Sequence, residues 1–104
     1  PPLRLVDVSF AQTRQAGVAV LTVRGAIVND ALSEALAPVI LVRLRDELGR
    51  DLQQWTYSLP QAALGAGKRA EFETSLSNPP PEARNLDVSF APPGGAPPKT
   101  PPQP

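Results

Sequence analysis

Few residues of this chain are of a type that could do chemistry, and the most concentrated group is acidic. The segment Asp46-Glu47-Leu48-Gly49-Arg50-Asp51 holds three carboxylates within six residues, a density that a calcium-binding loop can show. It lacks the alternating oxygen ligands and the closing Glu of an EF-hand loop, and Arg50 lies in its middle. We therefore interpret the segment as a hairpin turn, in which Asp46 caps the turn and Gly49 adopts the left-handed conformation.

A second short segment has the composition of a phosphate-binding loop. Gly65-Ala66-Gly67-Lys68 combines two glycines with a lysine, but the spacing to a second Gly before Lys-Ser/Thr is absent. No helix is expected after it, so no helix N-terminus would face an anion. We predict a glycine turn here.

Acid–base and nucleophilic catalysis have almost no residues to use. The chain contains no His and no Cys, and a serine nucleophile would depend on one of its two lysines, Lys68 and Lys99. Glu71 and Glu73 are two residues apart on an expected strand, which is typical of its solvated face. We therefore expect no enzymatic activity, no catalytic residue, no cofactor and no metal site.

Composition limits the domain count and the class of partner. A chain of 104 residues suffices for one domain with a modest core. Ten basic and ten acidic residues cancel, and one Trp and one Tyr are too few for a stacking platform, so nucleic acid is not an expected partner. Because ten of the fourteen prolines lie from Pro79 onward, we expect a folded domain over residues 1–90 and a disordered Pro/Gly-rich tail over residues 91–104.

The stretch from Val20 to Asn29 reads as a central strand that the other elements surround. Leu21, Val23 and Ile27 fall on one face, with Gly25 between them where a side chain would otherwise lie. A glycine in a strand interior marks a bend or a close approach of another group.

Two-residue alternation of apolar and polar side chains predicts six strands in total. A polar turn is expected over residues 11–17, and the segment from Asp30 to Ala37 is expected to be a loop with at most one helical turn. We expect an all-β fold, an immunoglobulin-like antiparallel β-sandwich of about seven strands, the seventh arising from division of a longer run. The expected strands are Leu3–Phe10, Val18–Val28, Val39–Asp46, Asp51–Leu59, Arg69–Ser77 and Asn85–Phe90.

One pentapeptide occurs twice. Asp7-Val8-Ser9-Phe10-Ala11 is repeated as Asp87-Val88-Ser89-Phe90-Ala91. A single five-residue match does not make a repeat architecture, and we interpret it as two terminal strands that meet similar surroundings.

Four residues are candidate contacts with a partner. Trp55 is the best candidate for a large core side chain, and Trp55 with Tyr57 could instead form a surface aromatic anchor. Val39 and Leu41, on the second face of an apolar strand, form a second candidate contact surface. An open sandwich also leaves unpaired edge strands, through which two copies could form a homodimer.

The order of the motifs resembles that of a known family. The chain is similar to a bacterial envelope domain of unknown function, found C-terminal to a zinc ribbon and a single membrane span, and to FxLYD-type immunoglobulin-like domains. The similarity covers about residues 3–90. It rests on Gly25-x-Ile27-x-Asn29, Pro38 before an apolar strand, Asp46-x-x-Gly49, Trp55, Leu64-x-x-Gly67, Phe72, Leu76, Pro79-Pro80 and Val88-x-Phe90.

This resemblance implies a periplasmic domain of a single-span inner-membrane protein with no enzymatic activity, in a family linked to cell-pole organisation and pilus assembly. It transfers no functional residue. The function that we expect is a noncatalytic protein-interaction or scaffolding domain. The alternative is a small-ligand or cell-wall glycan binding module that uses Trp55 and Tyr57.

Overall fold

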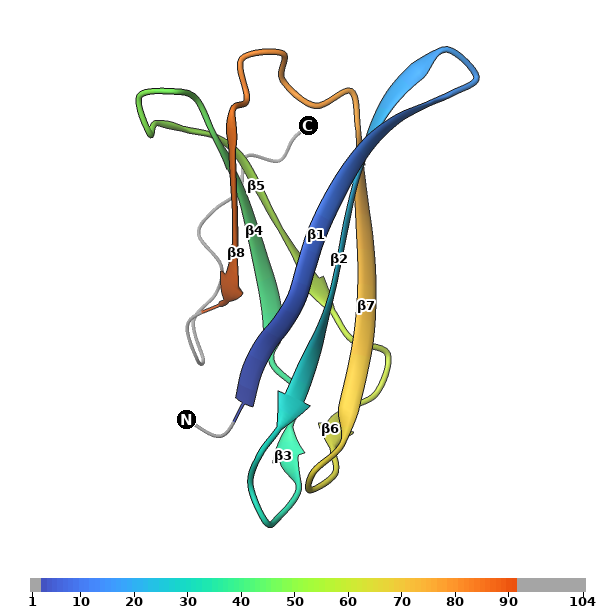
Figure 1. Cartoon of the computed structure of the whole chain (residues 1–104), viewed down its shortest axis with the longest axis vertical. Helices are drawn as coiled ribbons and strands as arrows, with labels where there is room; N and C mark the ends of the chain where they lie inside the picture. Colours follow the sequence, from blue (N-terminus) through green and yellow to red (C-terminus); the bar gives the residue numbers. More distant parts are fainter. Residues whose placement is uncertain (1–2, 92–104) are drawn as a thin grey trace. The chain divides into compact units, whose positions relative to one another are not determined.

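The computed structural model describes residues 3–91, and within that range the chain is all-β (Figure 1). All strand pairs are antiparallel, in a β-sandwich-like fold, as the alternation of side chains predicts. Among the described residues no helix is long and apolar enough to cross a membrane. The strands are β1 (Leu3–Gln15), β2 (Val18–Asn29), β3 (Ala35–Leu36), β4 (Val39–Arg45), β5 (Asp51–Ser58), β6 (Ala63–Leu64), β7 (Arg69–Ser77) and β8 (Asn85–Phe90).

All six predicted strands are present, and two short ones come in addition. β3 and β6 pair with each other through Ala35 opposite Leu64 and Leu36 opposite Ala63. They arise inside predicted loops and not by division of a longer run, so that expectation was wrong. Two residues are too few for alternation to show, because a strand is recognised only from several repeats of its two-residue period.

The chain forms two compact units. The first contains residues 3–37 and 59–79, and the second contains residues 38–58 and 80–91. The prediction of a disordered tail over residues 91–104 falls, apart from Ala91, outside the described residues.

The first unit is built on a three-stranded sheet in the order β1-β2-β7 (Figure 1). Its central strand, β2, places Leu21, Val23 and Ile27 in the core, as predicted. Gly25 lies directly opposite Phe72 of β7, and this buried ring covers the glycine. The expected close approach at Gly25 is therefore a cross-strand contact with an aromatic side chain.

β1 is longer than the alternation predicts. The expected polar turn over residues 11–17 was wrong, because β1 continues to Gln15 and pairs with β2 as far as Val18. The connection is only Ala16 and Gly17, with φ angles of 53° and 81°. Two positive φ values in a two-residue loop match the hairpin turns whose twist follows that of the strands. The polar residues of β1 did not look like a strand because both faces of this part of the hairpin are exposed.

A β-bulge interrupts β1 opposite Gly25. The register with β2 shifts between Val6 and Ser9, and Asp7 takes a φ of 55°. The Asp7 carboxylate accepts a hydrogen bond from the Arg69 guanidinium of β7 at 2.8 Å. This ion pair joins the bulge to the far strand of the sheet.

The second unit contains a three-stranded sheet in the order β5-β4-β8. β4 is central and deeply buried, with Ile40, Val42 and Leu44 on one face and Leu41 on the other. A central strand that is apolar on both faces is more hydrophobic than simple alternation predicts.

The repeated pentapeptide does not meet similar surroundings, so that interpretation was wrong. Both copies lie on edge strands with one antiparallel neighbour. In β8 the copy pairs regularly with β4, and Val88 and Phe90 are half-buried. In β1 the same residues begin at the bulge, and Val8 and Phe10 are exposed.

Candidate functional site

The predicted aromatic contacts, Trp55 and Tyr57, lie on β5 in the second unit. They pair with Val42 and Ile40 of β4, so they share the face on which these two buried residues lie. Both aromatic side chains are half-buried.

The predicted apolar contacts lie on the opposite face of the same sheet. Val39 pairs with Ser58 and Leu41 pairs with Thr56. Val39 is 37% exposed, whereas Leu41 is only 2% exposed. The structure therefore does not bring the four predicted contacts to one surface, and of this second pair only Val39 offers exposed area.

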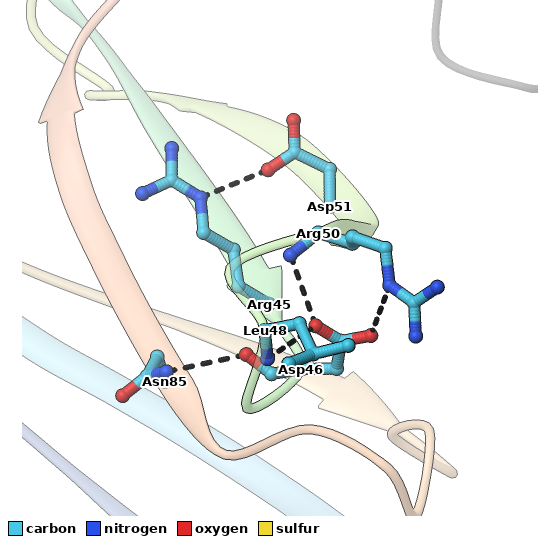
Figure 2. Close-up of polar contacts among 6 residues, drawn as sticks. All are labelled: Arg45, Asp46, Leu48, Arg50, Asp51 and Asn85. Carbon is cyan, nitrogen blue, oxygen red and sulfur yellow. Dashed lines mark hydrogen bonds and ion pairs between the residues drawn. The ribbon is translucent and has the colours of Figure 1, made fainter.

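The acidic segment forms the predicted turn (Figure 2). The Asp46 carboxylate accepts hydrogen bonds from the backbone N–H of Leu48 and of Arg50, both at 2.9 Å, and from Arg50 Nε at 2.8 Å. Gly49 has a φ of 81° and donates its N–H to the Asp46 carbonyl. Both parts of the turn interpretation, the Asp46 cap and the left-handed Gly49, are confirmed.

These donors also set the charge state of Asp46. The hydrogen bond from the Arg50 backbone N–H, with further ones from the Arg50 side chain and the Leu48 N–H, lowers the pKa of the Asp46 carboxyl below its usual range, against the opposing effect of burial. A depression of about 380 Å³ adjoins the turn, and its lining mixes carboxylates and guanidinium groups of Asp46, Glu47, Arg50, Glu82 and Arg84. Within residues 3–91 no group of three or more acidic side chains is arranged to hold a metal ion.

The first unit has one fully buried polar side chain, Asn29, at the end of β2. Its Nδ2 lies within hydrogen-bond distance of three carbonyl oxygens, those of Ser33 and Leu64 at 3.0 Å and Gly65 at 3.2 Å. Its Oδ1 accepts the Ala31 N–H at 2.9 Å. One amide group therefore ties the loop after β2 to the turn before β7.

Backbone contacts complete this connection. Asn29 donates its N–H to the Lys68 carbonyl at 3.0 Å and accepts the Gly67 N–H at 2.8 Å. The short β3–β6 strand pair also joins these two segments. The segment from Asp30 to Glu34 is thus a loop with fixed contacts, as expected, whereas Ala35 and Leu36 form the short strand β3 and not the predicted loop.

This fixed loop presents two leucines to solvent. Leu32 is 100% exposed and Leu36 is 80% exposed, the two highest values among the large apolar side chains of residues 3–91. Exposed apolar side chains cost solvation free energy of roughly 1.5–3 kcal/mol each relative to burial. A loop held in place by a buried amide has lost much of the conformational entropy that binding would otherwise remove.

The segment that carries the two leucines also carries charged side chains. The Arg4 guanidinium of β1 forms an ion pair with the Asp30 carboxylate, and the hydrogen bond from Arg4 lowers the pKa of Asp30. Glu34 lies between the two leucines in sequence and is exposed. We name Leu32, Glu34 and Leu36 the leucine loop. An apolar centre beside charged groups is the arrangement found at protein–protein contacts.

Sequence reasoning missed the leucine loop. The indication available was two leucines four residues apart in a segment too short for a helix, between Asn29 and Pro38. The expectation for this segment was a loop with at most one helical turn, and only the structure shows that both leucines are exposed.

Over residues 3–91 the chain is a small all-β domain in which a loop held by a buried amide presents two exposed leucines. Comparison with protein-family models, with curated proteins and with solved structures found no match.

Proposed function

We propose that this domain is a noncatalytic protein-interaction module and that the leucine loop is its principal contact. The observation that carries the proposal is the combination of full exposure of Leu32 with the buried Asn29 amide that fixes the loop. Exposed apolar anchors on a pre-organised element supply binding free energy with little entropy loss.

The charges of the loop favour a protein partner over a membrane. Glu34 is exposed beside the leucines, and Asp30 adds a second carboxylate whose charge Arg4 offsets. An anionic lipid surface would repel Glu34 as Leu32 approached it. A partner with an apolar pocket and a basic side chain at its rim matches both features.

We further propose that the domain works in the bacterial cell envelope, as a periplasmic part of a membrane-anchored scaffolding protein. The support for this location is the order of its motifs, from Gly25-x-Ile27-x-Asn29 to Val88-x-Phe90. A role in cell-pole organisation or pilus assembly belongs to the same proposal.

A pair of photo-crosslinking variants tests the leucine loop. A photoreactive amino acid replaces Leu36 in the full-length parent protein, and in a matched control it replaces Leu48, an exposed leucine of the second unit. We expect a discrete protein adduct from position 36 and none of the same size from position 48. The trapped protein, once identified and purified, should bind the Leu32→Ser/Leu36→Ser variant at least about tenfold more weakly than the unaltered protein, a loss of about 1.4 kcal/mol.

The corresponding test in cells uses the same residues without a crosslinker. The double Leu→Ser substitution should disturb the localisation or phenotype of the parent protein, whereas Leu48→Ser should not. Unchanged localisation, phenotype and adduct pattern with the double variant would refute the proposal.

A small-ligand or cell-wall glycan module is the second candidate, and one observation favours it. A depression of about 250 Å³ on the β1-β2-β7 sheet is lined by Ser9, Thr13 and Thr22 and by the Arg24–Glu73 pair. Titration with cell-wall oligosaccharides should then shift the amide resonances of Thr13 and Thr22. A response of Trp55 fluorescence without those shifts would point instead to the aromatic pair on β5.

A further inference from the structure

The outer edge of β1 is an unpaired strand edge with exposed apolar side chains. β1 hydrogen-bonds only to β2, so the backbone groups on its other side have no strand partner within the first unit (Figure 1). Phe10 is 61% exposed and Val8 is 41% exposed on this edge. Such edges promote pairing with a further strand unless charges, prolines or bulges prevent it.

The two edges of this sheet differ in that protection. β7, the opposite edge, carries three charged residues within its first five positions, Arg69, Glu71 and Glu73. From Val8 to Thr13, β1 has no charged residue, no proline and no glycine. The bulge at Asp7 disfavours strand pairing at only one end of this stretch, so the regular part of β1 remains a favourable pairing edge.

The second copy of the pentapeptide shows how the same residues behave where they are covered. Val88 and Phe90 are half-buried on β8, whereas Val8 and Phe10 are exposed on β1. The sequence of β1 is thus that of a strand whose apolar side chains lie against other groups, but within residues 3–91 the two side chains are exposed.

We propose that the occupant of this edge is β1 of a second copy of the chain, paired antiparallel about a two-fold axis beside Phe10. Residues that lie opposite each other in an antiparallel pair are on the same face of the sheet, whereas neighbours along a strand are on opposite faces. A two-fold axis perpendicular to a continuous sheet must therefore pass beside one residue, which lies opposite its own copy. Centring on Phe10 puts the two rings opposite each other and puts Ser9 opposite Ala11, two small residues. Centring on Ser9 would instead extend the pairing into the bulge, where the regular ladder is interrupted.

The pairing involves about five residues of each copy, so the dimer is weak. Interfaces of this size fall below the standard class, and we expect a dissociation constant on the order of 10–100 µM. The dimer is independent of the leucine loop, which lies on a different segment of the first unit.

Sedimentation of the full 104-residue chain over a range of about 1 µM to 1 mM tests the dimer. We expect a concentration-dependent dimer that Phe10→Lys abolishes, because it places two cations opposite each other. Leu48→Lys is the matched control, an exposed apolar residue of the second unit replaced by the same charge, and should leave the association unchanged. A monomer at all concentrations, or a dimer that Phe10→Lys does not abolish, would overturn the proposal.

Disulfide trapping tests the register directly, because the chain contains no cysteine of its own. In the proposed register the two Phe10 Cα atoms are directly opposite, within reach of a disulfide, whereas the two Thr13 positions are about 20 Å apart along the strands. Mild oxidation should crosslink the Phe10→Cys variant at least about tenfold faster than the Thr13→Cys variant. Equal rates, or faster crosslinking at position 13, would refute pairing about Phe10.

Discussion

The Phe72 ring lies directly over Gly25, and its Cζ atom is 2.7 Å from the point that a Cβ at residue 25 would occupy. Val8 Cγ2 closes the same space at 3.2 Å. The ring is buried and therefore has little room to move aside. Gly25 is needed here because the volume of its missing side chain is filled by an aromatic ring from the neighbouring strand.

Gly25→Ala should consequently destabilise the domain. The added methyl forces Phe72 or the backbone to shift in a packed core, and we expect a loss of about 1–3 kcal/mol in the free energy of unfolding. Urea denaturation followed by circular dichroism measures this loss. A matched control is Gly65→Ala, which meets only the flexible Lys68 side chain and should cost less.

A double-mutant cycle then tests whether the ring is the cause. Phe72→Leu removes the atoms that meet the new methyl, so Gly25→Ala should cost less in that background. The two losses should fall short of additivity by about 1 kcal/mol, as for residues in contact. Strict additivity would show that Gly25→Ala acts through something other than the Phe72 ring.

Asn29→Ala should destabilise the first unit strongly. The substitution leaves three carbonyl oxygens and the Ala31 N–H without the amide that joins them, and we expect a loss of roughly 3 kcal/mol. Urea denaturation measures it, and Gln53→Ala, which truncates an exposed amide side chain on β5, is the control. A loss no larger than that of the control would contradict the role assigned to the Asn29 side chain.

The Asn29→Asp variant separates hydrogen bonding from shape. At neutral pH the introduced carboxylate would face three carbonyl oxygens and repel them, so we expect destabilisation despite the similar size. Because this environment raises the pKa of a carboxyl group, acidification protonates it and should recover part of the loss.

Leu41→Ala and Val39→Ala should differ widely although the residues are two apart on β4. Leu41 is buried and its truncation leaves a cavity, so we expect a loss of about 2–5 kcal/mol. Val39 is partly exposed, and its truncation should cost less than about 1 kcal/mol. Equal losses in urea denaturation would contradict the burial of Leu41.

The Asp46 turn should make stability depend on pH in the acidic range. The pKa of Asp46 is lower in the folded state than its ordinary value of 3.8, so its contribution is present above that value and is lost as the pH falls through the lower folded pKa. Asp46→Asn removes the titrating group. The stability difference between the unaltered protein and this variant should therefore shrink below about pH 4, as measured by urea denaturation at each pH. A difference that is constant from pH 7 to pH 3 would contradict this account.

The strands were predictable because their side chains alternate over six or more residues. β7, with Ala70 and Phe72 in the core and Glu71 and Glu73 exposed, is the clearest example. The Asp46 turn was predictable for a related reason, since the carboxylate and Gly49 satisfy local backbone needs that are visible in the sequence. Such features depend on neighbours close along the chain.

The leucine loop and the extension of β1 were not predictable in this way. The exposure of Leu32 depends on whether residues far along the chain cover it. The alternation of apolar and polar side chains carries no information about such distant contacts. The polar residues from Gln12 to Gln15 form a strand because β2 pairs with them, although neither face is buried. Both outcomes are set by long-range pairing and not by local preference.

The single amide of Asn29 has a consequence for local opening of the domain. The loop after β2 and the turn before β7 share it, so neither segment can separate from the other without breaking the same set of hydrogen bonds. Their amide protons should exchange with solvent through one common opening event, as a cooperative unit. A partner that binds Leu32 should therefore slow hydrogen exchange of the Gly67 amide, although Gly67 lies on the other of the two segments.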